Sequence, residues 1–140
     1  MVTAGYLLDT SILVFLLRRQ RPAIVERMEH ADGALHVSTI SVAELAYGAS
    51  RSSDPLRNRI AVEEVLSRLI VLDFDALAAS RSGTVRADLA AAGSPIGGYD
   101  LLLAGHALAA DLTMVTNNVK EFERVRGLRV DDWSQSASEG

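Results

Sequence analysis

The chain is notable first for what it lacks. Its 140 residues include no cysteine, which excludes a disulfide framework, a thiolate zinc site and thiol catalysis. No basic segment precedes an apolar run at the N-terminus, as a signal peptide would require, and the longest apolar stretches are far shorter than a membrane span. We therefore expect a soluble, cytoplasmic protein with no membrane partner.

Positive charge is also scarce. The formal net charge is −4, and Lys120 is the only lysine beside thirteen arginines. This balance argues against a protein that holds nucleic acid by bulk electrostatic attraction. Arg18, Arg19 and Arg21 follow an expected helix, where they either contact phosphate groups of a ligand or form a solvated face, and the second interpretation is favoured slightly.

Apolar segments alternate between strand-like and helix-like patterns along the chain. Alternating strands and helices predict an α/β domain with a parallel sheet covered on both faces. We expect one domain over residues 1–133 and a disordered tail over 134–140. The expected strands cover about 4–8, 35–38, 70–72, 112–115 and 128–130; the expected helices cover about 11–17, 22–29, 39–49, 55–69, 75–92 and 99–110, with a short helix after 118.

The segment Gly5–Ser11 combines a short strand, an acid and two hydroxyl residues before a helix begins. Asp9 therefore stands at the carboxyl end of the first strand, and ligands of open α/β sheets bind beyond such strand ends. An acid at this position is also a common helix N-cap. Asp9 alone does not separate the two interpretations.

Two further acids stand at element boundaries. Glu44 lies early in a helix, where Ser41 and Glu44 have capping-box spacing, and Asp100 lies in the first turn of an apolar helix, where it also suits the helix dipole. An unpaired carboxylate in apolar surroundings is costly. If Asp9, Glu44 and Asp100 converge, a cation must offset their repulsion, and oxygen ligands without thiols favour Mg²⁺ or Mn²⁺. Such ions activate water for displacement at phosphorus.

Four segments in order carry a family resemblance: LLDTS at 7–11, SVAELAYG at 41–48, PIGGYDLLLA at 95–104 and VTNN at 115–118, continued by EFERV at 121–125. Together they resemble the PIN-domain family, and within it the VapC-type toxins of bacterial toxin–antitoxin pairs. The likeness covers nearly the whole chain. It implies a three-layer α/β/α fold with a five-stranded parallel sheet, and a Mg²⁺-dependent endoribonuclease in which Mn²⁺ can substitute.

The resemblance also implies roles for residues. Asp9, Glu44 and Asp100 would be the catalytic acids and hold the metal ion, giving 5′-phosphate and 3′-hydroxyl ends. Asn118 stands where many relatives have a further acid, so it would offer an oxygen without a charge. Glu121 would supply the missing charge if its loop turned it inward. Hydrogen bonds that support the site are expected from Thr10, Ser11, Thr116 and Asn117.

Partners follow from the same resemblance. It implies an RNA substrate, a cognate VapB-type antitoxin that blocks the acidic site, and a homodimer. Because an acidic site attracts a basic segment, the antitoxin contact is physically sensible. The sequence contains no recognisable motif for base recognition, so it does not identify the target RNA.

Other interpretations stay open. Domains that form an aspartyl phosphate would need a second Asp where Ser11 stands, or a lysine near the last strand, so they fit less well. A PIN-like binding module remains an alternative because of Asn118. His106 is expected to be a satisfied buried histidine, and Trp133 is expected to pack the last strand onto the body. The expected caps or solvated turns are Asp73, Asp75, Asp111, Asp131 and Asp132.

Overall fold

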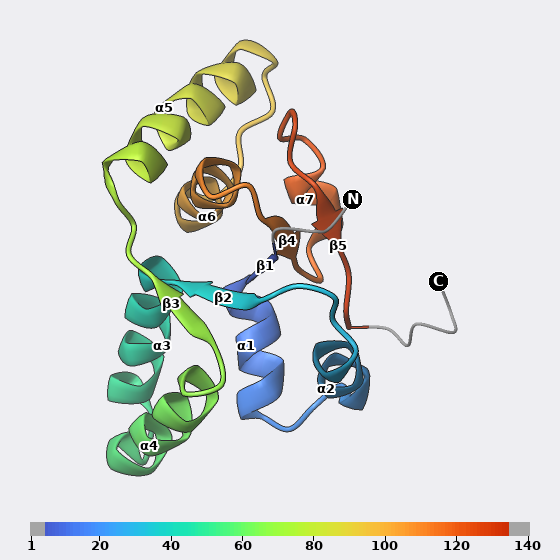
Figure 1. The fold of residues 1–140 in the computed structure, drawn as a ribbon. Coiled ribbons are helices and arrows are strands. Elements are labelled where there is room, and N and C mark those ends of the chain that lie inside the picture. The colour runs from blue at the N-terminus through green and yellow to red at the C-terminus, as the bar shows by residue number, and fades with distance from the viewer. Residues whose placement is uncertain (1–4, 135–140) are drawn as a thin grey trace.

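Five parallel strands form the centre of the molecule in a computed structural model that describes residues 5–134. Their spatial order is β3-β2-β1-β4-β5 (Figure 1). The pairing confirms the predicted five-stranded parallel sheet. The strands are β1 (Tyr6–Leu8), β2 (Leu35–Ser38), β3 (Ile70–Leu72), β4 (Thr113–Val115) and β5 (Val130–Asp131).

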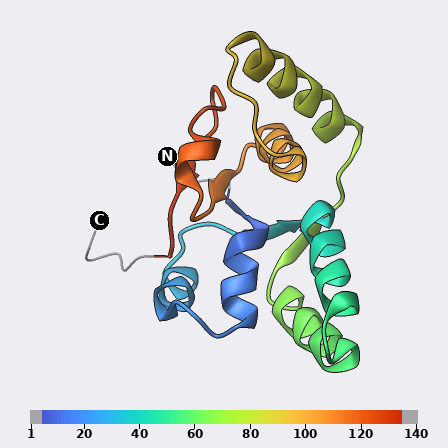
Figure 2. The same cartoon turned by 180° about the vertical axis from the view of Figure 1, so that it is seen from behind.

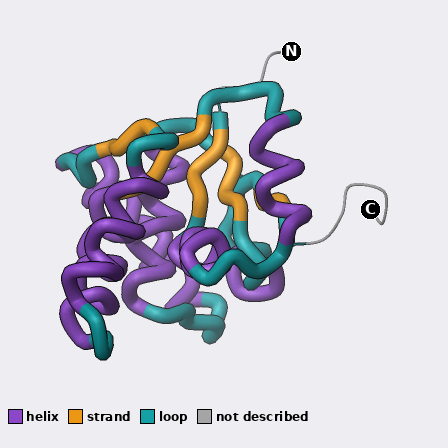
Figure 3. Tube along the Cα trace, turned by 90° about the horizontal axis from the view of Figure 1, so that it is seen from below, coloured by secondary structure: helices purple, strands orange, loops and turns teal. Residues whose placement is uncertain are grey.

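Seven helices in residues 5–134 connect and cover these strands. Figure 2 shows the first four on one side of the sheet and the last three on the other, and Figure 3 shows helices around the strands from below. No helix in this part of the chain is long and apolar enough to cross a membrane. The helices are α1 (Thr10–Leu17), α2 (Pro22–Glu29), α3 (Thr39–Arg51), α4 (Pro55–Leu66), α5 (Ala76–Ala91), α6 (Gly98–Ala109) and α7 (Val119–Phe122).

Adjacent residues of the central strands face opposite layers. Leu7 and Met114 pack with residues of α5, α6 and α7, whereas Leu8 and Val115 pack with residues of α1 to α4. All four side chains are fully buried. Because successive strand residues point to opposite faces, a strand covered on both sides is apolar throughout. This arrangement explains the continuous apolar runs and gives the three-layer α/β/α architecture.

The chain direction across the sheet reverses at β1. From β1 the chain moves outward through β2 and β3, and later returns to place β4 and β5 on the other side. The reversal opens a crevice beyond the carboxyl ends of β1 and β4, which is where ligands bind in such sheets. Asp9 follows β1 directly and Thr116 follows β4, so the topology brings both residues to this crevice.

Two predicted boundaries need comment. The last strand begins at Val130 rather than at residue 128, because residues up to Leu128 are engaged in turns after α7. Residue 4 of the expected first strand and residues 135–140 of the expected tail lie outside the described part. Ser134 is described, and its amide and hydroxyl both donate to Asp132 Oδ1, at 2.8 and 2.6 Å.

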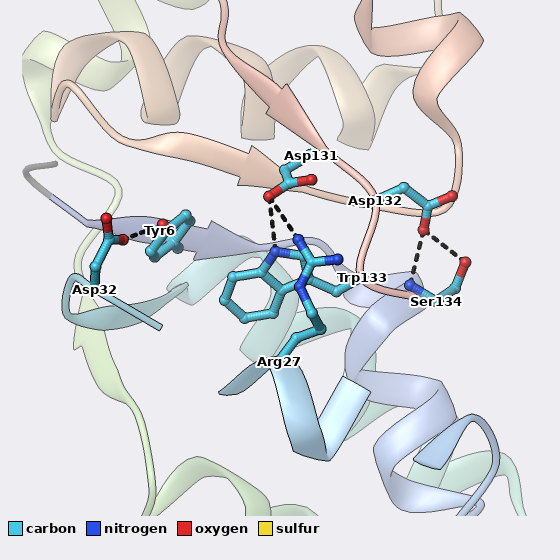
Figure 4. A network of polar contacts seen from close by, with 7 residues as sticks. All are labelled: Tyr6, Arg27, Asp32, Asp131, Asp132, Trp133 and Ser134. Atoms are coloured by element: carbon cyan, nitrogen blue, oxygen red, sulfur yellow. Dashed lines mark hydrogen bonds and ion pairs between the residues drawn. The ribbon is translucent and has the colours of Figure 1, made fainter. Parts of the chain in front are cut away.

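Asp131 is a correction to the sequence prediction, because it is neither a cap nor a solvated turn. It lies in β5 and accepts hydrogen bonds from Trp133 Nε1 at 2.9 Å and from Arg27 Nη2 at 3.2 Å (Figure 4). The Trp133 ring is buried and packs on Tyr6, with centroids 4.9 Å apart. Trp133 therefore packs the segment after β5 against β1 and α2, which agrees with the prediction that it packs the last strand onto the body of the domain.

Candidate active site

Asp9 occupies the N-cap position of α1, but its side chain makes no capping hydrogen bond. Instead, Oδ2 accepts from Thr116 Oγ1 at 2.6 Å and from Ser11 Oγ at 2.9 Å. Asp9 is only 3% exposed. The contact with Thr116 spans the crevice between β1 and β4. The simple capping interpretation is therefore wrong, and the carboxylate is held in place by hydroxyl groups.

Glu44 reaches the same region from α3. That helix begins at Thr39 with Ser38 as its N-cap, so Ser41 and Glu44 lie inside the helix and form no capping box. Thr10 Oγ1 donates to Glu44 Oε1 at 2.7 Å and lies 2.8 Å from Ser41 Oγ. Because the Thr10 hydroxyl has one proton and gives it to Glu44, the Ser41 hydroxyl donates to Thr10. A short hydroxyl chain thus orients Glu44.

Asp100 lies in the first turn of α6 and has the most perturbed environment of the three acids. The pKa of Asp100 is raised from 3.8 to about 7, first by burial, then by a shared hydrogen bond with Glu121, and then by the charges of Asp9, Glu121 and Glu44. The three acids are therefore within electrostatic reach of one another. Without a cation, the site keeps a proton on Asp100 that an ordinary aspartate would have lost.

Glu121 turns toward the site from α7. Its Oε1 accepts from the Gly97 amide at 2.8 Å, and its other oxygen accepts from the Asn118 side-chain amide. Partial burial raises the pKa of Glu121, but these two bonds, the hydrogen bond with Asp100 and the charge of Arg124 outweigh burial and lower it. Glu121 therefore adds a negative charge beside Asp100 that Asn118 does not provide.

The acids line one open cavity of about 430 Å³. None of the three ion pairs within residues 5–134 includes Asp9, Glu44 or Asp100. The predicted supporting residue Thr116 is not among the residues that line the cavity. Its hydroxyl donates a hydrogen bond to Asp9, which does line the cavity, and accepts one from the backbone amide of Asn118 at 2.9 Å. The cavity is lined by Asp9, Thr10, Ser11, Val14, Glu44, Asp100, Asn117 and Asn118.

The donor set suits a hard divalent cation. Its charged and amide groups offer oxygen ligands, and the described chain has neither thiols nor a histidine cluster here. Within residues 5–134, no three His, Cys, Asp or Glu side chains are close enough to enclose an ion. Mg²⁺ does not need such a cage, because it keeps several waters and takes one or two carboxylates from the protein. The residues therefore fit Mg²⁺ in an open site.

Several other predicted residues lie away from this cavity. Arg18, Arg19 and Arg21 are exposed after the far end of α1, about 12 Å along the helix from Asp9, which favours a solvated face. His106 is buried, and its Nδ1 lies 2.8 Å from Ser38 Oγ. This contact joins α6 to the start of α3, which are the helices that carry Asp100 and Glu44.

Two contributors were missed by sequence reasoning. Ser38 and Ser41 are fully buried hydroxyls on or after β2. A serine beside an apolar strand is a weak signal, because it is equally consistent with a helix cap, which is also what Ser38 is. The catalytic and metal-binding roles of the predicted residues stay predictions at this point.

Comparison with known proteins supplies independent findings. A family model described as PIN domain matches residues 6–128. The chain is 44% identical to the tRNA(fMet)-specific endonuclease VapC of Shigella flexneri, covering 92% of this chain and 98% of that protein. It is 41% identical to ribonuclease VapC2 of Haemophilus influenzae, with coverage of 91% and 97%. The crystal structure of DNA-bound VapBC from Salmonella typhimurium aligns with a TM-score of 0.88 at 43% identity, covering 92% and 98%.

Proposed function

The chain belongs to the PIN-domain family, in its VapC group, and we propose that it is a Mg²⁺-dependent endoribonuclease, the toxin of a toxin–antitoxin pair. The observation that carries the proposal is the cavity at the β1–β4 crevice. Three acids meet there without any cationic side chain to pair with them. By contrast, Asp131, Glu64 and Asp111 each pair with an arginine elsewhere in the molecule.

The chain's own residues divide the work as follows. Asp9 and Asp100 would hold the ion, and Glu44 would share it or orient a water. When bound, a divalent ion supplies Lewis-acid stabilisation at phosphorus and lowers the pKa of water. Thr116 and Ser11 fix the Asp9 carboxylate, and Thr10 fixes Glu44. Glu121 holds the Gly97 amide at the N-cap of α6, which positions the first turn containing Asp100.

Asp100 must also release its proton to bind an ion. The carboxyl group with a pKa of about 7 is partly protonated at neutral pH when the cavity holds no cation. A bound cation favours the charged form and therefore lowers this pKa. Ion binding is thus expected to displace a proton from the Asp100–Glu121 pair and to become tighter as the pH rises.

The partners in this proposal come from relatives. The Salmonella typhimurium complex is described as VapBC bound to DNA, and we propose that a VapB-type antitoxin likewise binds this chain and blocks its acidic cavity. A homodimer is part of the same proposal. Initiator tRNA is the first RNA to test, because the Shigella flexneri relative is named for tRNA(fMet) cleavage.

The decisive experiment uses purified protein free of antitoxin. Total RNA would be incubated with it in Mg²⁺, Mn²⁺ or EDTA, and the new ends would be sequenced. Wild-type protein should cut at discrete sites and leave 5′-phosphates. Asp100→Asn should not cut, whereas Asp111→Asn, which changes an exposed acid paired with Arg129, should cut normally.

A PIN-like binding module is the second candidate. The observation that favours it is Asn118, whose amide donates to Glu121 and adds no charge to the cavity. In that case the protein would bind RNA or protein without producing new ends in either ion. A melting temperature unchanged by Mg²⁺ and Mn²⁺ would support this candidate, since ligands that bind the folded state raise the melting temperature.

A further inference from the structure

His106 is a buried, titratable side chain to which the proposed reaction assigns no role. It lies in the interior of α6 and is 3% exposed. Its Nδ1 lies 2.8 Å from the hydroxyl oxygen of Ser38, which is fully buried. Ser38 ends β2 and is also the N-cap of α3. Because α3 and α6 lie on opposite sides of the sheet (Figure 2), this contact joins the two outer layers of the molecule.

The hydrogen bonds of Ser38 decide which nitrogen of His106 carries the proton. The Ser38 oxygen accepts from the Ile40 amide at 3.1 Å. A hydroxyl also has one proton to donate, and within residues 5–134 this oxygen has no contact besides those with Ile40 and His106. Because a buried hydroxyl proton without an acceptor is costly, Ser38 donates to Nδ1. His106 is therefore a neutral imidazole with its proton on Nε2.

The surroundings of the imidazole also favour its neutral form. Burial lowers the pKa of His106, and the opposing effect of the Asp75 charge is smaller. The Phe74 ring, which precedes Asp75, lies nearly perpendicular to the imidazole, with ring centroids 5.4 Å apart and an angle of 86° between the planes. The Phe74 amide donates to Thr39 Oγ1 at 3.0 Å. The ring that packs on His106 is thus attached to the first residue of α3.

α6 is held close against α5 beside His106. A Cβ added to the neighbouring Gly105 would lie 2.1 Å from Ser82 Oγ and 2.7 Å from the Ser82 backbone. Only a residue without a side chain permits so close an approach of two helices. Because α6 cannot move nearer to α5, the imidazole has a fixed place from which it contacts the start of α3.

The contact lies at the same distance along each helix from a cavity acid. Glu44 is six residues after Ser38 on α3, and Asp100 is six residues before His106 on α6, which is about 9 Å along each helix axis. Within residues 5–134, no hydrogen bond or ion pair joins the Glu44 and Asp100 side chains to each other. Their separation therefore depends on how α3 and α6 are placed. A misplacement of about 1 Å at an active site can cost on the order of 10²-fold in rate.

We infer that His106 is a positioning residue for the cavity: by accepting the Ser38 hydroxyl, its imidazole sets the spacing between Glu44 on α3 and Asp100 on α6. This inference rests on the proposed function and concerns the same site. In this role His106 contacts neither the ion nor the RNA. The alternative is a histidine that only stabilises the fold, and the two roles predict different results for substitutions.

The tautomer of His106 is the first test, and it needs neither metal nor RNA. The protein would be labelled with ¹⁵N at histidine, and NMR at neutral pH would show which ring nitrogens carry protons. The chain has three histidines, so the signals of His106 would be assigned by their loss in His106→Asn. Nε2 should carry a proton and Nδ1 should not. A proton on Nδ1, in the other tautomer or in an imidazolium, would overturn the inference.

Two substitutions separate the acceptor from the ring. His106→Asn places an amide oxygen near the position of Nδ1 but loses the packing on Phe74, whereas His106→Phe keeps a ring beside Phe74 and offers no acceptor. Binding of Mn²⁺ would be measured by electron paramagnetic resonance. His106→Phe should weaken it by about 10-fold or more, as loss of a supporting contact does, and His106→Asn should stay within about threefold of wild type. A purely structural histidine predicts the reverse order, because a ring lost from the core costs more than one hydrogen bond; that order would overturn the inference.

Ser82→Ala is the matched control. It removes a buried hydroxyl that donates to the Ala78 carbonyl of the same helix at 2.8 Å, and it leaves the contact between α3 and α6 intact. Its Mn²⁺ affinity should equal that of wild type. All proteins would be compared well below the lowest melting temperature among them, so that each is folded. A loss of affinity in Ser82→Ala as large as that in His106→Phe would assign the effect to general destabilisation and overturn the inference.

The two proposals fail in different ways. If wild-type protein cuts RNA and His106→Phe binds Mn²⁺ and cuts as wild type does, the positioning role falls and the nuclease proposal stands. If wild-type protein binds Mn²⁺ without producing new RNA ends, and His106→Phe weakens that binding while His106→Asn does not, the positioning role stands and the nuclease proposal falls. If wild-type protein neither binds Mn²⁺ nor cuts RNA, both fall.

Discussion

Two groups of acids in this molecule are built in opposite ways. At the end of the chain, Asp131 faces the Arg27 guanidinium and the Trp133 indole N–H. At the β1–β4 crevice, the side chains of Asp9 and Glu44 accept hydrogen bonds from hydroxyl groups alone among residues 5–134, and Asp100 shares its surroundings with Glu121. The first group carries its own cation, whereas the second is surrounded by further acids.

The difference separates an acid that holds the fold together from acids kept for a ligand. The Asp131 side chain is 41% exposed and faces Arg27, so it keeps part of its hydration and has a partner of opposite charge. Unpaired carboxylates in a shared cavity repel one another in the metal-free protein, and burial together with this repulsion raises the pKa of Asp100. A bound cation would relieve this repulsion between the carboxylates. Neutralising Asp100 should therefore raise the stability of the metal-free protein and lower its activity, whereas neutralising Asp131 should lower stability and leave activity unchanged.

Asp100→Asn is the change with the largest expected effect. It should lower cleavage by roughly 10²-fold or more, because several kcal/mol of charge stabilisation depend on the ion site. In EDTA at pH 8 it should raise the melting temperature, because one member of a repelling set becomes neutral. Cleavage assays and thermal denaturation would test both. A variant that is less active and also less stable than Asp111→Asn would contradict this account.

Thr116→Val should have the next largest effect. It removes the 2.6 Å hydrogen bond to Asp9 and leaves the Asn118 amide without its acceptor. Loss of such a supporting contact lowers metal affinity by about 10- to 100-fold. The Mg²⁺ concentration needed for half-maximal cleavage would measure it. Thr113→Val on β4, the strand that Thr116 follows, is the control, since Thr113 contacts Arg129 and not the cavity. Equal effects of the two changes would refute the role of Thr116.

Asp131→Asn should act on stability alone. It breaks the ion pair with Arg27 and weakens the contact with Trp133 Nε1. Because the pair is partly exposed, the expected loss is roughly 1–2 kcal/mol in the free energy of unfolding. Urea denaturation would measure this loss, and cleavage should be unchanged. Arg27→Gln should give a similar loss, and the two losses should not add in the double variant.

The smallest expected effect is a pH dependence in the absence of metal. Asp100 binds its proton more tightly in the folded protein than in the unfolded chain. Its contribution to stability is therefore fully present below pH 3.8 and lost as the pH rises through about 7. The melting temperature of wild type relative to Asp100→Asn should fall by a few degrees, about 2–8 °C, between pH 5 and 8.

His106 does not confound that comparison. Burial lowers the pKa of His106, so its effect runs the other way and reduces stability as the pH falls below its usual range. Both proteins contain His106, and the difference between them cancels its contribution. Added Mg²⁺ should remove most of the fall in the wild-type protein. A difference between the two proteins that is constant across this pH range would argue against a shared proton on Asp100.

Most of the fold was predictable because it depends on local patterns. Runs such as Tyr6–Leu8 and Thr113–Val115 are apolar, short and flanked by helical periodicity, which indicates buried parallel strands. Asp75 was predicted to cap a helix, and its Oδ1 accepts from the Ala78 amide at 2.9 Å. The error at Asp131 arose because an Arg27 partner more than a hundred residues away leaves no local signal.

The sequence by itself determined the layers of the fold, the family and the acids, because apolar periodicity and ordered motifs are local properties of the chain. Only the tertiary structure decided how those acids are held. The strand order places Thr116 against Asp9, brings Thr10 between Ser41 and Glu44, and turns Glu121 toward Asp100. These contacts depend on distances between elements far apart in sequence, and folding alone sets those distances.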